Sequence, residues 1–330
     1  MVRTIITALV LVLSLSQVGC GSNGAAASFD LDQTEQNFGQ KILYNNKVDI
    51  VFVVDNSTSM GQHQQRLVAQ IPNLVAVLKS LKMNYHIVAI STSMGIDGNG
   101  GQFLGSPMVL TNQTANLEAL LQQRIAQGET GSNNERGLLS LETALSPSYL
   151  NGAGAGFFRD DALLAVIELS DEDDKSTKTA SYYANFLDAL KPPSVEGRKS
   201  WIFNFIGVLE NSSACRTFND YSEVGQIQMQ LAEISGGNKE SLCSNSLSSA
   251  VSNIKARIVQ ILTDFYLKTE PLEATIRVAV NGKLVAKSDT NGWVYIQENG
   301  KHIIRFKGDA VPPADADIRI DYTPKTNQDI

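Results

Sequence analysis

The stretch D-N-S-T-S places Asp55, Ser57 and Ser59 at alternate positions directly after the apolar run 48–54. In an irregular loop this spacing allows one carboxylate and two hydroxyls to turn their oxygens toward a common point. Oxygen ligands without sulfur or imidazole suit a hard cation such as Mg²⁺, Mn²⁺ or Ca²⁺. We therefore expect divalent-cation binding at this loop.

The elements that must position this loop are predicted by the hydrophobic pattern from residue 47 onward. The run 48–54 is apolar except at Asp49, which is typical of a parallel strand covered on both faces. Strands alternate with helices after it, and this order predicts a doubly wound, mostly parallel α/β sheet. Ligands of such sheets lie beyond the carboxyl ends of the strands, where Asp55 falls. Strands are expected over 85–91, 163–169 and 201–209, and helices over 62–81, 116–126, 136–145, 180–190, 224–234 and 247–262.

Local signals refine several of these elements. Pro72 lies inside the first helical pattern and predicts a kink or a late helix start there. Ser132 and Glu135 form the S-x-x-E pattern of a capping box before the helix over 136–145. After Pro271 the pattern changes to short strands over 274–280, 283–286, 293–297, 302–306 and 318–322, which predicts a small all-β module.

The D-x-S-x-S loop after a buried strand, followed by Met60 and Gly61, resembles the von Willebrand factor A (VWA) domain. The hallmark of that family is the metal-ion-dependent adhesion site (MIDAS), and the resemblance covers about residues 47–266. It implies a VWA/Rossmann-like fold with Mg²⁺, or Mn²⁺ or Ca²⁺, at the site. It also implies that the cation takes an acidic oxygen from a protein or glycan ligand.

The resemblance implies two further groups of ligands. One is a hydroxyl before the helix over 136–145, for which Thr130 fits by its Gly-Glu-Thr context and Ser132 by its spacing to Gly137. Both stay open, with a slight preference for Ser132, although the capping box gives Ser132 another role. The other is Asp171, which follows the strand over 163–169 and Ser170. In this family the serines and the third-loop hydroxyl contact the cation directly, and the two aspartates act largely through water or their own hydrogen bonds.

Other chemistry has little support in the sequence. The acidic residues Glu172, Asp173 and Asp174 after Asp171 are expected to form a solvated loop rather than a second Ca²⁺ site, and His63 is expected at the surface. No Ser-His-Asp order, Cys-His pair or phosphate-binding glycine loop stands out, so we do not expect an enzyme. The net charge is −7 and no long basic run exists, so a nucleic-acid partner is not expected.

The first residues read as a targeting segment. Arg3 precedes an apolar stretch over 5–15, and Val18, Gly19 and Cys20 resemble a bacterial lipobox, with Gln17 departing from its usual apolar residue. The resemblance implies lipidation of Cys20 and a lipid-anchored protein of the bacterial cell envelope, with sorting to the outer membrane; the alternative is ordinary cleavage near 25–27. The expected organisation is a signal peptide over 1–20, a tether over 21–46, the VWA domain over 47–268 and the β module over 269–330.

The chain has three cysteines, and lipidation of the first leaves Cys215 and Cys243 as a pair. Because an exported protein meets an oxidising space, we expect a disulfide between them, the alternative being two unpaired buried thiols. The function expected from all these features is adhesion or envelope assembly through a MIDAS cation. The alternative is a scaffold subunit of an envelope, pilus or secretion complex in which the metal only stabilises the loops.

Overall fold

A six-stranded sheet forms the centre of the protein in the computed structural model, which describes residues 40–42, 46–95, 100–194, 198–216 and 223–325. The strand order is β4-β3-β2-β5-β6-β7. All neighbours are parallel except β4, which pairs with β3 in the antiparallel direction at one edge. These strands are β2 (Lys47–Val54), β3 (Asn84–Ser91), β4 (Leu110–Thr111), β5 (Leu163–Ser170), β6 (Trp201–Gly207) and β7 (Lys239–Ser241). The doubly wound, mostly parallel α/β fold is confirmed.

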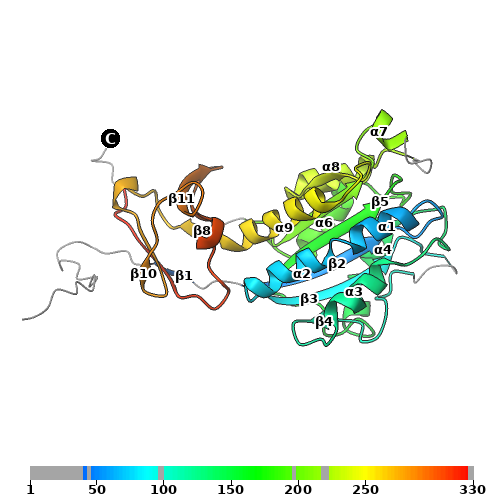
Figure 1. Cartoon of the computed structure of the whole chain (residues 1–330), viewed down its shortest axis with the longest axis horizontal. Helices are drawn as coiled ribbons and strands as arrows, with labels where there is room; N and C mark the ends of the chain where they lie inside the picture. Colours follow the sequence, from blue (N-terminus) through cyan, green and yellow to red (C-terminus); the bar gives the residue numbers. More distant parts are fainter. Residues whose placement is uncertain (1–39, 43–45, 96–99, 195–197, 217–222, 326–330) are drawn as a thin grey trace, which may run out of the picture. The chain divides into compact units, whose positions relative to one another are not determined.

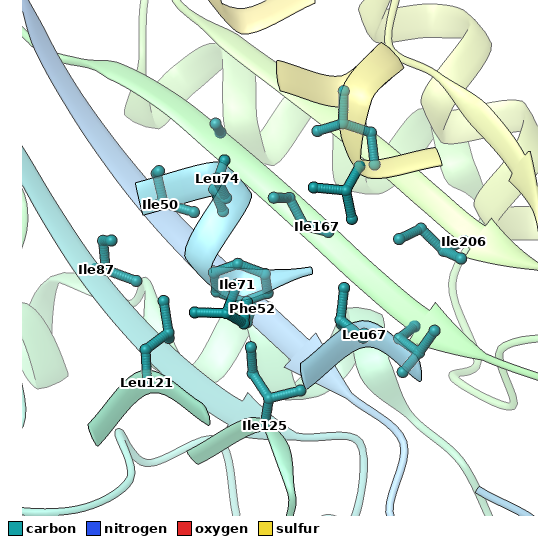
Figure 2. Packing of buried hydrophobic residues seen from close by; sticks show 14 of the residues in the cluster. Ile50, Phe52, Leu67, Ile71, Leu74, Ile87, Leu121, Ile125, Ile167 and Ile206 are labelled. Carbon is teal, nitrogen blue, oxygen red and sulfur yellow. The ribbon is translucent and has the colours of Figure 1, made fainter. Parts of the chain in front are cut away.

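Helices cover both faces of this sheet because successive side chains of the strands point to opposite faces. On β2, Ile50 and Phe52 pack with α1, α2, α3 and α9, and Val51 and Val53 pack with α4, α6 and α8 on the other face. Figure 1 shows α1 and α2 along β2, and Figure 2 shows Leu67, Ile71 and Leu74 packed around Phe52. The helices are α1 (Gly61–Val68), α2 (Ile71–Ser80), α3 (Leu117–Ile125), α4 (Gly137–Ala144), α5 (Pro147–Leu150), α6 (Ala180–Leu190), α7 (Ser213–Arg216), α8 (Gln226–Ser235) and α9 (Ser248–Thr263).

The single helix predicted over 62–81 is two helices, and Pro72 marks the start of the second one rather than a kink within one helix. Pro72 lies in the first turn of α2, where its missing N–H removes no intrahelical hydrogen bond. The two helices still present one apolar face, because Leu67, Ile71 and Leu74 belong to the same core cluster. The break therefore changes the direction of the chain without interrupting the core.

The C-terminal part forms two antiparallel sheets, as the short strand patterns predict. One has the order β1-β13-β9-β10 and the other β11-β12-β8. Asn281 and Gly282 both have positive φ and form a tight turn between β9 and β10. The elements are β1 (Gln40–Ile42), β8 (Asp264–Leu267), β9 (Arg277–Val280), β10 (Lys283–Leu284), β11 (Gly292–Glu298), β12 (Lys301–Lys307) and β13 (Ile318–Asp321), with 3₁₀ turns at Glu273–Thr275 and Gly308–Ala310.

The limits of this C-terminal part differ from the expected ones at both ends. Residues 40–42, expected in the tether, form β1 and pair with β13. Residues 264–267, expected within the VWA domain, form β8 and pair with β12. Strand pairing is a non-local property, and short segments carry little sequence signal of their partner. Cys20 and residues 21–39 lie outside the described residues.

The predicted disulfide is present between Cys215, at α7, and Cys243, just after β7. It joins two connections that are 28 residues apart in the sequence. None of the described helices is both long enough and apolar enough to pass through a bilayer.

Candidate metal site

Asp55 organises the loop that follows β2, and both of its carboxylate oxygens are used. Oδ1 accepts the Ser57 N–H at 2.9 Å, and Oδ2 accepts the Ser170 hydroxyl at 2.7 Å. The side chain is fully buried, and burial raises the pKa of Asp55, an effect that these hydrogen bonds oppose. The carboxylate thus joins the ends of β2 and β5, which are neighbours in the sheet.

Ser57 and Ser59 lie close together in the same loop, with their hydroxyl oxygens 3.2 Å apart. Two adjacent ligands of an octahedral Mg²⁺ lie about 3.0 Å apart, since each Mg–O distance is about 2.1 Å. The backbone of Ser57 is fixed by Asp55, and Ser59 is half-buried. The two hydroxyls are therefore spaced as neighbouring cation ligands would be.

The third loop is tied to the first through Asn56. The Asn56 carbonyl accepts the Gly131 N–H at 2.7 Å, and its side-chain oxygen accepts the Ser93 hydroxyl at 2.9 Å. Ser93 Oγ in turn accepts the Ser132 N–H at 3.0 Å. Gly131 fits only as glycine, because a Cβ there would lie 2.3 Å from Asn56 Oδ1. Residues that follow β2 and β3 and precede α4 thus meet at one place.

Gln64 makes a second tie between the same loops from inside α1. Its side-chain N–H groups donate to the Asp55 carbonyl at 2.8 Å and the Gly128 carbonyl at 2.9 Å. Its side-chain oxygen accepts the Gly128 N–H at 3.0 Å. Glu129 adds a contact by accepting the Gly61 N–H at 3.1 Å. Neither Asn56 nor Gln64 was a predicted site residue; the available signal was that Gln64 shares the buried helix face of Leu67.

The two candidates for the third hydroxyl have different surroundings. Ser132 is half-buried, and its Oγ accepts the Asn134 N–H at 3.0 Å. Thr130 is exposed and lines, with Asn56, a polar pocket of about 500 Å³. The predicted capping box is wrong, because neither Ser132 nor Glu135 caps α4, which begins at Gly137, and Glu135 instead accepts the Thr92 hydroxyl. The competing role foreseen for Ser132 is therefore absent.

Asp171 is buried directly after β5, and its backbone carbonyl accepts the Glu223 N–H at 3.1 Å. The acidic run after it is not the solvated loop that was expected. Asp174 Oδ2 accepts the Leu138 N–H at 2.8 Å in the first turn of α4, and Asp173 Oδ1 accepts the Ile227 N–H at 2.9 Å in the first turn of α8. Carboxylates at helix N-termini accept hydrogen bonds from free backbone N–H groups and are stabilised by the helix dipole. These interactions explain why this acidic run is withdrawn from solvent.

Further carboxyl groups lie buried behind the loops. Glu168, on β5, and Glu135, before α4, are each 1% exposed. Burial raises the pKa of Glu168 well above its usual value, and burial followed by repulsion from Asp55 raises the pKa of Glu135 to about 8. His63, expected at the surface, is also buried. A divalent cation at the neighbouring loops would favour the ionised forms of these carboxyl groups.

The fit of these residues to a cation rests on hydroxyls as much as on carboxylates. Among the described residues no group of three or more His, Cys, Asp and Glu side chains is arranged to hold a metal ion. The candidate set differs in kind, because Ser57, Ser59 and either Thr130 or Ser132 outnumber Asp55 and Asp171. Such a set suits a hard cation that keeps part of its water shell.

Comparison with known proteins supplies structural neighbours only. No protein-family model matches the chain, and no curated protein matches it. Proximal thread matrix protein 1 of the mussel byssus is similar over 68% of this chain and 50% of its own, at 15% identity and a TM-score of 0.42. A second structure of it, titled as having a zinc-occupied MIDAS motif, has 14% identity and a TM-score of 0.41.

The pilus adhesin SpaC of Lactobacillus rhamnosus GG is similar over 86% of this chain and 39% of its own, at 12% identity and a TM-score of 0.44. This chain therefore spans half or less of the length of these neighbours. At such identities and TM-scores the likeness carries nothing about function, which has to come from the residues of this chain.

Proposed function

We propose that this protein is an exported, membrane-anchored VWA-type binding protein that captures a protein or glycan ligand through a divalent cation, in adhesion or envelope assembly. One observation carries the proposal: Asp55 accepts the Ser57 N–H and the Ser170 hydroxyl at the carboxyl ends of two neighbouring strands, where Ser57 and Ser59 Oγ lie 3.2 Å apart. This edge is the place where doubly wound sheets bind ligands.

The roles of the residues follow from their surroundings. Ser57, Ser59 and the hydroxyl of Ser132 or Thr130 would hold the cation, Mg²⁺ or else Mn²⁺ or Ca²⁺. Asp55, being already engaged by two hydrogen bonds, would act by orienting Ser57 and by supplying charge. The link from Ser132 through Ser93 to Asn56 supports Ser132 over Thr130. When bound, the cation supplies an open position for an acidic oxygen of the partner.

Metal binding is tested by titrating Mg²⁺ and Mn²⁺ into the purified chain by calorimetry. Ser59→Ala should weaken binding at least tenfold, because a cation ligand is lost while a half-buried side chain is merely shortened. Thr58→Ala is the matched control, since Thr58 is an exposed hydroxyl of the same loop. Equal affinities of the two variants would show that the loop does not hold the cation.

The scaffold alternative is distinguished by a capture experiment. Envelope extract is passed over the immobilised chain in Mg²⁺ and in EDTA, with Asp55→Ala and Thr58→Ala run in parallel. The proposal expects a bound component that EDTA and Asp55→Ala both remove while circular dichroism shows a folded chain. Capture that survives in EDTA would instead support a scaffold with a stabilising metal.

The membrane anchor is proposed from the lipobox pattern alone, with Cys20 as the lipidated residue. Expression of the full chain in a bacterium followed by detergent phase partition tests it. The wild-type chain should enter the detergent phase, and Cys20→Ser should remain in the aqueous phase. Partition of both chains into the same phase would contradict lipidation at Cys20.

A further inference from the structure

A second pocket lies at the end of the sheet away from the candidate metal site. Trp201 begins β6 and lines this pocket, whereas Asp55 and Ser170 lie where β2 and β5 end. The pocket has a volume of about 470 Å³ and is formed between the start of β6, α9, β8 and the turn from β11 to β12. Its lining includes the basic residues Arg198, Lys199, Arg257, Lys301 and Arg305.

The charge of this pocket is opposite to that of the protein. Five basic side chains line it against two carboxylates, Asp264 and Glu298, while the whole chain has a net charge of −7. Asp188, just outside the lining, accepts from Lys199 at 2.8 Å and so neutralises one of the five. A basic excess remains on an acidic protein, and such a local field concentrates anions.

The arginines show where this positive charge is uncompensated. Arg305 is compensated, because both oxygens of Asp264 accept from it at 2.7 Å each and Glu298 lies 3.5 Å from its Nη2. Within the described residues, neither Arg257 nor Lys301 forms an ion pair with a carboxylate; Arg257 Nε donates to the Gly236 carbonyl at 3.0 Å. With its amide oriented to satisfy its neighbours, Gln260 accepts from Arg305 Nη2 at 2.6 Å and Arg257 Nη1 at 3.2 Å.

Two guanidinium groups therefore converge on one neutral oxygen at the wall of a pocket, with the Lys301 ammonium on the same lining. Because Arg305 is paired with two carboxylates, the uncompensated positive charge on this lining belongs to Arg257 and Lys301, and a bound anion would neutralise it. Guanidinium groups bind phosphate through two parallel hydrogen bonds, and an ammonium group adds a point charge. We propose that this pocket binds a phosphate group through Arg257 and Lys301, independently of the metal site.

The phosphate can belong to a soluble phosphate ester or to the headgroup of an anionic lipid, since both present the same oxygens. Vesicle binding separates the two sources.

The test measures inorganic phosphate binding by calorimetry at constant ionic strength, using the full chain with Cys20→Ser so that no acyl group contributes. Arg257→Gln and Lys301→Gln should each weaken binding by about tenfold, as expected for loss of one charge-assisted contact. Lys255→Gln is the control, because it removes the same charge from α9 outside the pocket. Lys301 is exposed, so its substitution leaves folding intact.

Vesicle sedimentation distinguishes the two sources of phosphate. If phosphatidylglycerol vesicles capture the chain better than phosphatidylcholine vesicles, and Arg257→Gln but not Lys255→Gln reduces that capture, the headgroup is the ligand. If phosphate affinity falls in both pocket variants while vesicle capture is unchanged, the ligand is a soluble phosphate ester. Absence of phosphate binding, or equal affinity in all three variants, would overturn the proposal.

Discussion

At the candidate metal site, single residues form hydrogen bonds with more than one neighbouring segment. Asp55 bonds two partners with its two oxygens, and Asn56 joins the first loop to Gly131 and Ser93. Because each of these contacts crosses between loops, a substitution at either residue alters the position of ligands that it does not touch. The geometry of the site is thus fixed mainly by its polar neighbours.

Glu135 gives a residue-scale prediction about pH. Burial and repulsion raise its pKa to about 8 from 4.5, so the folded chain holds a proton that the unfolded chain releases. In EDTA the free energy of unfolding should therefore fall as pH rises from about 5 to about 8, by up to roughly 1.4 kcal/mol per pH unit for one such group. Glu135→Gln should flatten this part of the curve.

The measurement is urea unfolding at several pH values between 5 and 9 in EDTA. Glu118→Gln serves as the control, because Glu118 lies on the exposed side of α3 and pairs with Lys79. If the wild-type and Glu135→Gln curves keep the same slope across this range, Glu135 does not hold the additional proton.

At this scale the sequence predicts which residues are candidate cation ligands, but not which groups pack and form hydrogen bonds around them. Asp55, Ser57 and Ser59 stand out because their spacing follows an apolar strand, and the structure places Ser170 beside them. The burial of Asp173 and Asp174 could not be predicted, because a run of acidic residues normally lies in water. These carboxylates cap helices only because the first turns of α4 and α8 lie beside them in the fold.

At the scale of elements, α1 is fastened to the site by Gln64. Gln64→Leu keeps the size of the side chain but leaves the Asp55 carbonyl and both backbone groups of Gly128 without this partner. The free energy of unfolding should fall by about 1–3 kcal/mol, because the carbonyl of the buried Asp55 becomes unsatisfied. Mg²⁺ affinity should fall as well, since the first and third loops lose a shared contact.

Gln65→Leu is the matched control for this prediction, because Gln65 is the exposed neighbour on the same helix. Chemical unfolding and Mg²⁺ calorimetry of both variants form the measurement. A Gln64→Leu chain that binds Mg²⁺ like the Gln65→Leu chain would show that α1 does not help to hold the loops.

Elements with strong periodic patterns were predictable, and those defined by long-range pairing were not. The run 48–54 corresponds to β2 and the pattern over 180–190 to α6. In both cases the spacing of apolar residues indicates which faces of the element are buried. In contrast, β1 and β8 exist because of partners far along the chain. The capping box failed for a similar reason: Thr92 takes Glu135 away from the helix start.

At the scale of the whole molecule, the disulfide between Cys215 and Cys243 closes the segment that contains α8 and β7. It closes a loop across 28 residues, which in the chain-entropy model contributes roughly 3–4 kcal/mol. The double substitution Cys215→Ser with Cys243→Ser should lower the free energy of unfolding by about this amount. Urea unfolding of both chains with and without reductant tests it.

Reductant is the internal control of that experiment, because it should destabilise the wild-type chain and leave the double variant unchanged. A double variant as stable as the oxidised wild-type chain would show that the unfolded state gains nothing from release of this loop. The fold class itself followed from the order of strands and helices in the sequence, whereas the arrangement of the two C-terminal sheets required the structure.

The acidic run after β5 has a consequence for how a bound cation would be felt elsewhere. Asp171 is separated by only two and three residues from the carboxylates that start α8 and α4. So short a segment cannot take up a displacement within itself. A movement of Asp171 toward or away from an ion should therefore displace the first turns of α8 and α4, which cover the same face of the sheet. This short segment thus connects the ligand-binding edge of the sheet with those two helices.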